Sequence, residues 1–151
     1  MKTKLLSLLL ACAALARADD PRLVNLATRA QAGTGSDVLT AGFVIGPGAN
    51  KTILVRAVGP TLAVFGVRDV LPDPVVTLTS GGNTVATNDD WSSTNASMVA
   101  KAAAGVGAFA PPAGSRDAAL LVTLAPGAYT VEVRGKNGAE GIALFEIYEV
   151  P

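Results

Sequence analysis

Short apolar runs separated by Gly, Pro, Asn and Asp dominate the chain from residue 23 to its end. In the run 51–58, KTILVRAV, Ile53, Val55 and Ala57 alternate with residues that would lie on the opposite face of a strand. Such a period of two indicates a β-strand with one buried face. By the same pattern and its Gly and Pro punctuation, further strands are expected over 23–29, 38–45, 75–79, 84–87, 117–124, 128–134 and 142–150.

Two segments depart from this alternation. Residues 92–104 carry small apolar side chains spaced i, i+3, i+4 and i+7 behind Ser92 or Ser93, which predicts one short helix with a serine N-cap. Residues 61–67 fit either a short helical turn or an irregular crossing, and both alternatives bury Leu62 and Phe65.

The turns set the expected connections between strands. The turn Ser80-Gly81-Gly82-Asn83 predicts a hairpin between the strands at 75–79 and 84–87. The last three strands, joined by Gly-containing turns, are expected to form an antiparallel meander. Together these elements predict an all-β fold, an antiparallel β-sandwich of jelly-roll-like type with one short helix, and a closed barrel is the alternative.

The first 18 residues have the composition of a secretory signal peptide. Two lysines precede an apolar run over 5–15, and Ala16-Arg17-Ala18 supplies small residues for cleavage after Ala18. We therefore expect a signal peptide over 1–18 and one domain over 19–151, secreted or held at the cell surface or in the periplasm. The alternative is a lipid anchor at Cys12, since Leu9-Leu10-Ala11-Cys12 loosely resembles a lipobox. The apolar run is too short to span a membrane.

Charge narrows the range of partners. The chain has 12 basic and 12 acidic side chains, and removal of Lys2, Lys4 and Arg17 with the signal leaves nine basic against 12 acidic, a net charge of −3. Nucleic acid and anionic membranes both require clustered Lys and Arg. A small acidic excess without a basic cluster argues against both.

Side-chain chemistry argues against catalysis. The sequence has no histidine, and its one cysteine lies in the expected signal peptide. Serine catalysis would then need a lysine base, and no such spacing exists among Ser92, Ser93, Ser115, Lys51, Lys101 and Lys136. Glycoside hydrolysis by two carboxylates would need Asp89 or Asp90 with Glu132 or Glu146. Because strand alternation places both glutamates on the solvent side, we expect no enzyme.

The densest set of polar ligands is Asn88-Asp89-Asp90-Trp91. Calcium prefers carboxylate and carbonyl oxygens from a loop, so Asn88, Asp89 and Asp90 are candidate calcium ligands. The alternative is that these are ordinary turn and cap residues. Trp91 is a candidate platform for a sugar ring if it is exposed, and the alternative is that it packs in the core.

Two resemblances extend this interpretation. From Asp117 the text DAALLVTLAPGAYTVEVRGKNGAEGIALFEIYEV resembles the last strands of bacterial pre-peptidase C-terminal domains. The segments LATRAQAGTGSDVLTAGFVI, TILVRAVGPTLAVFGV, LPDPVVTL, NDDW and GSRDAALLVTLAPGAYTVEVRG are similar to a module of large secreted bacterial proteins. These resemblances imply an extracellular β-sandwich of accessory or structural role, without catalytic residues.

The sequence therefore predicts a secreted, non-catalytic β-sandwich with a structural or interaction role at the cell exterior. Its expected partner is an unidentified protein or a cell-surface polysaccharide. The alternative is a carbohydrate-binding module stabilised by calcium, with Asn88, Asp89, Asp90 and Trp91 at its site.

Overall fold

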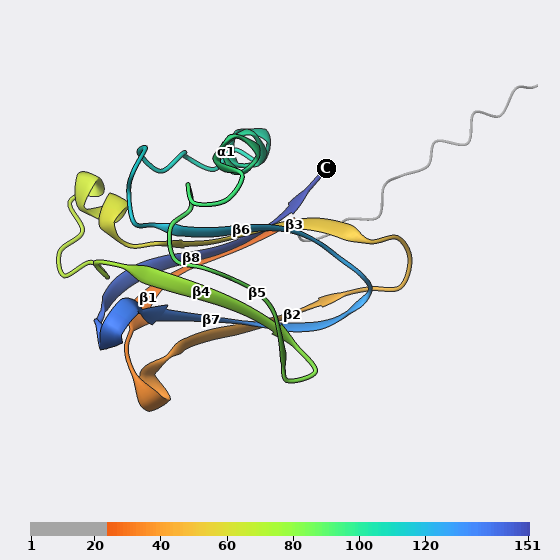
Figure 1. The fold of residues 1–151 in the computed structure, drawn as a ribbon, viewed down its shortest axis with the longest axis horizontal. Coiled ribbons are helices and arrows are strands. Elements are labelled where there is room, and N and C mark those ends of the chain that lie inside the picture. The colour runs from red at the N-terminus through yellow and green to blue at the C-terminus, as the bar shows by residue number, and fades with distance from the viewer. Residues whose placement is uncertain (1–23) are drawn as a thin grey trace, which may run out of the picture.

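The computed structural model describes residues 24–151, so the expected signal peptide and Cys12 lie outside the described residues. Two four-stranded antiparallel sheets face each other (Figure 1). The first has the order β1 (Asn25–Ala32), β8 (Gly141–Val150), β3 (Lys51–Val58), β6 (Ala118–Leu124). The second has the order β2 (Leu39–Ile45), β7 (Gly127–Gly135), β4 (Pro74–Ser80), β5 (Asn83–Asn88). The predicted antiparallel β-sandwich is confirmed.

The connections differ from the prediction at the C-terminal end. The predicted β4–β5 hairpin is present, but β6, β7 and β8 do not form a meander, because β7 lies in the opposite sheet from β6 and β8. Both β6 and β8 instead flank β3. The sequence pattern shows that a strand has one apolar face, and strands of either sheet satisfy that pattern equally well.

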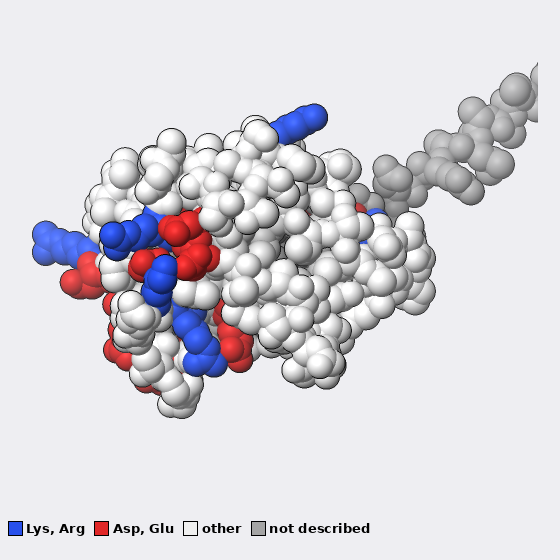
Figure 2. Space-filling view, viewed as in Figure 1, with Lys and Arg blue, Asp and Glu red and all other residues white. Residues whose placement is uncertain are grey.

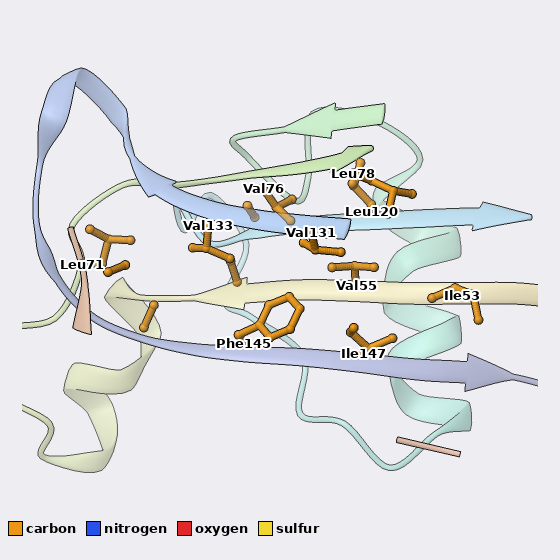
Figure 3. Close-up of a cluster of buried hydrophobic side chains, with 14 of the residues drawn as sticks. Ile53, Val55, Leu71, Val76, Leu78, Leu120, Val131, Val133, Phe145 and Ile147 are labelled. Carbon is orange, nitrogen blue, oxygen red and sulfur yellow. The ribbon is translucent and has the colours of Figure 1, made fainter. Parts of the chain in front are cut away.

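The core between the sheets follows the predicted alternation. Ile53, Val55 and Ala57 of β3 point inward, where they meet Phe145 and Ile147 of β8 (Figure 3). Leucine and valine side chains from β4, β6 and β7 fill the rest of this layer. Truncation of one such buried side chain typically costs about 2–5 kcal/mol.

A third layer covers the outer face of the first sheet. Helix α1 (Ala96–Gly105) packs Val99 and Ala103 against a second apolar cluster that includes Leu54 and Tyr148 (Figure 1). The helix begins four residues later than Ser92. Residues before it form a turn in which the Ser93 hydroxyl donates to the Asp90 carbonyl, and Asn95 takes a left-handed conformation at φ 53°. The predicted serine N-cap is therefore wrong.

Three short 3₁₀ turns complete the described part of the chain: η1 (Gly35–Asp37), η2 (Pro60–Phe65) and η3 (Lys136–Gly138). The ambiguous segment 61–67 is thus largely the helical turn η2. It buries Leu62 but leaves Phe65 64% exposed, so the prediction that both are buried is half right. No helix within residues 24–151 has the length and apolar character that crossing a membrane requires.

Candidate functional site

Asn88 lies at the end of β5, where its side chain connects three segments. Its Oδ1 accepts a hydrogen bond from the Ala119 N–H at 3.0 Å. Its Nδ2 donates to the Asp90 carbonyl at 3.0 Å and to the Ser93 hydroxyl at 3.1 Å. These bonds tie the edge of the second sheet to β6, and they occupy the amide oxygen that a cation would need.

Two aspartates follow Asn88, and the first of them forms an ion pair with η3. The Asp89 carboxylate accepts a bond of 2.6 Å from the Lys136 ammonium in η3. This contact lowers the pKa of Asp89 and raises that of Lys136. Among residues 24–151, no three acidic, histidine or cysteine side chains gather closely enough to hold a metal ion. The calcium assignment at Asn88, Asp89 and Asp90 therefore stays a prediction, and a cation at Asp89 would have to displace Lys136.

Trp91 is a packing residue in this structure. It is only 6% exposed and lies in the cluster under α1. Its indole N–H donates to the Pro112 carbonyl at 3.2 Å, and its backbone N–H donates to the Asp117 carbonyl at 2.7 Å. A ring enclosed in this way offers no free face to a saccharide, so the geometry matches the core alternative for Trp91.

The paired carboxylates considered for hydrolysis do not share a cleft. Asp89 pairs with Lys136, Glu132 pairs with the exposed Arg134 at 2.8 Å, and Glu146 is buried on the opposite sheet. Two of the three serine candidates are likewise engaged elsewhere: Ser93 donates to a backbone carbonyl and Ser115 donates to Asp117.

Glu146 corrects the prediction that it faces solvent. It is 6% exposed on the outer face of β8, where its Oε2 lies 3.4 Å from the Arg56 Nε and its Oε1 accepts from the Tyr148 hydroxyl at 2.7 Å. Burial and the neighbouring Glu146 raise the pKa of Tyr148 to about 12. The Arg56 guanidinium lies 4.6 Å from the centre of the Phe109 ring. The sequence pattern missed this cluster because the covering segment, which includes Phe109, comes from outside the sheet.

Asp117 is a second buried acid that the sequence did not single out. Its Oδ1 accepts from the Gly59 N–H at 2.8 Å and from the Thr61 N–H at 3.3 Å. Its Oδ2 accepts from the Thr61 hydroxyl, and from the Ser115 hydroxyl at 2.7 Å. Asp117 therefore fixes the start of η2 against the first sheet. No reactive group lies free beside it, which assigns it a structural role.

One apolar groove lies beside η2, which we call the aromatic groove. Phe65 and Phe109 face each other there with ring centres 5.3 Å apart. Its lining consists of Arg29, Leu62, Phe65, Val67, Phe109 and Leu144. Charged side chains gather at one end of the face seen in Figure 2, and much of the remainder is uncharged.

A second opening lies between the free edges of β1 and β2. Asn25 to Arg29 of β1 are all exposed, and Val44 of β2 is 75% exposed. A cavity of about 400 Å³ runs between the two edges, with Leu26, Phe43 and Ile147 among its lining. Within residues 24–151 this side of the sandwich is therefore open, and the side of β1 away from β8 pairs with no other strand.

Comparison with known proteins finds a solved structure of similar fold. One solved structure, the pre-peptidase C-terminal domain of a collagenase from Bacillus anthracis, matches with a TM-score of 0.50 over 82% of this chain and 89% of that one. The β-sandwich of this chain is therefore similar in fold to that pre-peptidase C-terminal domain. Sequence identity is 12%, so the likeness concerns the fold alone. No family model and no curated protein matches the sequence.

Proposed function

We propose that the chain is an exported, non-catalytic module that binds an extended protein segment at the cell exterior through its open β1 edge. Export rests on the basic start, apolar run and small-residue exit of residues 1–18, with lipidation at Cys12 as the alternative. The observation that carries the binding role is the continuous exposure of β1 from Asn25 to Arg29.

A free strand edge binds another strand through main-chain hydrogen bonds. The Glu149 N–H donates to the Val24 carbonyl at 2.8 Å, and the register of β1 with β8 makes these two residues direct opposites. Along two antiparallel strands, pairs of directly opposite residues that share backbone hydrogen bonds alternate with pairs that share none. Asn25, Ala27, Arg29 and Gln31 consequently direct their N–H and C=O groups away from β8, toward the free edge.

Ala27 allows a direct test. Proline at this position removes an outward N–H without removing a bond to β8, whereas threonine keeps the N–H and suits a strand. The wild-type chain, Ala27→Pro and Ala27→Thr would each be mixed with surface proteins from cells that produce the chain, then crosslinked. We expect the same crosslinked product with wild type and Ala27→Thr, and its loss with Ala27→Pro. Equal products from all three chains would overturn the role of the edge.

The carbohydrate alternative requires a separate experiment. The three chains would be sedimented with insoluble polysaccharides and cell-wall material, with calcium or with a chelator. Selective retention that needs calcium and is unaffected by Ala27→Pro would replace the proposed function with a carbohydrate-binding one. The burial of Trp91 gives that alternative no aromatic platform.

Export is tested on the chain expressed from Met1 in a bacterial host. We expect a product outside the cytoplasm whose mass corresponds to a chain that begins at Asp19. A lipid-modified product that disappears in Cys12→Ser would place the chain on a membrane instead. Full-length protein confined to the cytoplasm would overturn export.

A further inference from the structure

Within residues 24–151 the two sheets have four edge strands, and β1 is the most available of them. It has eight residues, against seven in β2, six in β5 and seven in β6. β2 contains Gly42, which favours a strand less than other residues do. A register shift between Leu78 and Thr79 disturbs the pairing of β4 with β5, and the first three residues of β6 are buried. Native edges are commonly blocked by proline, bulges or inward-pointing charges, and β1 has none of these.

The two faces of β1 define what an added strand must look like. Leu26 lies opposite Ile147 and Thr28 opposite Phe145, so even-numbered residues face the core side. Odd-numbered residues face outward, where Arg29 lines the aromatic groove. An added strand therefore needs apolar or small side chains on one face and polar ones on the other. The sequence of β1, NLATRAQA, has this composition itself.

Resting on the proposed function, we propose that the partner of β1 is β1 of a second copy of this chain, paired antiparallel with Thr28 opposite Thr28. The N–H groups that point toward the free edge belong to odd-numbered residues. Hydrogen-bonded pairs between the two copies must therefore join an odd-numbered residue of one copy to an odd-numbered residue of the other. If Arg29 were the residue that pairs with its own counterpart, two guanidinium groups would lie opposite each other, which is destabilising. If Thr28 is the residue that pairs with its own counterpart, every residue from 25 to 31 has a partner and Ala27 lies opposite Arg29.

The remaining pairs in this register are compatible. Asn25 lies opposite Gln31, which lets two amides bond, and Leu26 lies opposite Ala30 on the core side, where a large side chain meets a small one. The first sheets of the two copies then form one continuous sheet of eight strands, within the usual range for sheets. A contact made by one strand per copy is small, so the dimer is expected to be weak, with a dissociation constant in the micromolar range or above.

The association itself is tested by sedimentation equilibrium of the purified chain from micromolar to near-millimolar concentration. We expect wild type and Ala27→Thr to move from monomer toward dimer, and Ala27→Pro to associate about tenfold more weakly or not at all. Circular dichroism of all three establishes that each is folded. A wild-type chain that stays monomeric throughout, or an Ala27→Pro dimer of equal strength, overturns the inference.

The register is tested by oxidation of single-cysteine variants in a Cys12→Ser background. Thr28→Cys places two sulfurs at an unbonded pair, where the Cα atoms lie about 4.5 Å apart and a disulfide can form. Leu26→Cys is the matched control. In this register the residue-26 positions of the two copies lie four residues apart along the strands, a distance of roughly 13 Å. We expect a disulfide dimer for Thr28→Cys only. A dimer for Leu26→Cys only would overturn this register.

Failure of this inference is distinguishable from failure of the proposed function. A monomeric chain whose crosslinked product with surface proteins is lost in Ala27→Pro retains the binding role and excludes only the second copy as partner. If the chain stays monomeric and the crosslinked product is the same in Ala27→Pro as in wild type, both the second copy as partner and the binding role of the β1 edge are overturned.

Discussion

Asp117 and Thr61 are joined twice, since the carboxylate of Asp117 accepts a hydrogen bond from both the N–H and the hydroxyl of Thr61. The two residues are 56 positions apart in the sequence. This contact fastens η2, which carries the exposed Phe65, to the residue that precedes β6. The aromatic groove therefore depends on a buried acid outside its own lining.

Removal of this acid should destabilise the fold. Asp117→Ala leaves four donor groups without their acceptor, because the bonds from the Gly59 N–H, from the N–H and hydroxyl of Thr61, and from the Ser115 hydroxyl are all lost. We expect the free energy of unfolding in urea to fall by about 3 kcal/mol or more. Asp69→Asn is the control, since Asp69 is exposed at a positive φ that asparagine also tolerates. Equal stability of the two variants would show that the Asp117 bonds contribute nothing.

The Arg56–Glu146 pair should behave as a buried ion pair. Arg56 is 1% exposed, and its Nη atoms have no hydrogen-bond partner in the part of the chain that the structure describes. Arg56→Met leaves Glu146 buried without its cation and should cost about 3–5 kcal/mol, whereas Arg56→Met combined with Glu146→Leu should recover most of that loss. Urea denaturation measures both variants. Lys51→Met, at the more exposed pair with Glu149, should cost less than about 1 kcal/mol. A double variant no more stable than the single one would contradict this account.

Tyr148 should make stability sensitive to strong alkali. Its pKa in the folded chain is raised to about 12, from the ordinary tyrosine value of 10.0. Below pH 10 the phenol is protonated in both states and the stabilisation is fully present. Between pH 10 and 12 the unfolded chain loses this proton first, so stability falls as pH rises. Urea midpoints across this range should drop less in Tyr148→Phe than in wild type, and parallel profiles would refute the assignment.

The calcium hypothesis leads to a prediction about Lys136. If Asn88, Asp89 and Asp90 bind calcium, the ion must compete with the Lys136 ammonium, which lies 2.6 Å from Asp89. Millimolar calcium should then raise the thermal midpoint of Lys136→Met more than that of wild type. Asp90→Asn should remove the difference. An unchanged midpoint in wild type and in Lys136→Met would exclude a calcium site here.

The sequence predicted those features that depend on one strand and its own two faces. The strand Lys51–Val58 has the predicted bounds, and its inward residues are the predicted ones. The second hairpin strand, the short helix and the sandwich architecture follow from equally local patterns. These signals suffice because apolar alternation and turn residues act within a few positions of each other.

The sequence did not predict features that depend on a third layer. Alternation along β8 places Glu146 on the outer face, which is correct, but the pattern cannot show that Phe109 covers that face over Arg56, the neighbour of Glu146 on β3. The same covering layer encloses Trp91, so exposure could not be inferred from its polar neighbours. Asp117 resembles an ordinary turn residue until η2, from far along the chain, lies against it.

The position of Trp91 has a spectroscopic consequence. It is the only tryptophan of the chain, and it lies between α1 and the outer face of the first sheet, away from the core between the sheets. Intrinsic fluorescence therefore reports on the docking of the helix, while far-ultraviolet circular dichroism is dominated by the eight strands. If the two signals change at the same denaturant concentration, all three layers unfold as one cooperative unit. If fluorescence changes first, the helix layer detaches from a sandwich that remains folded.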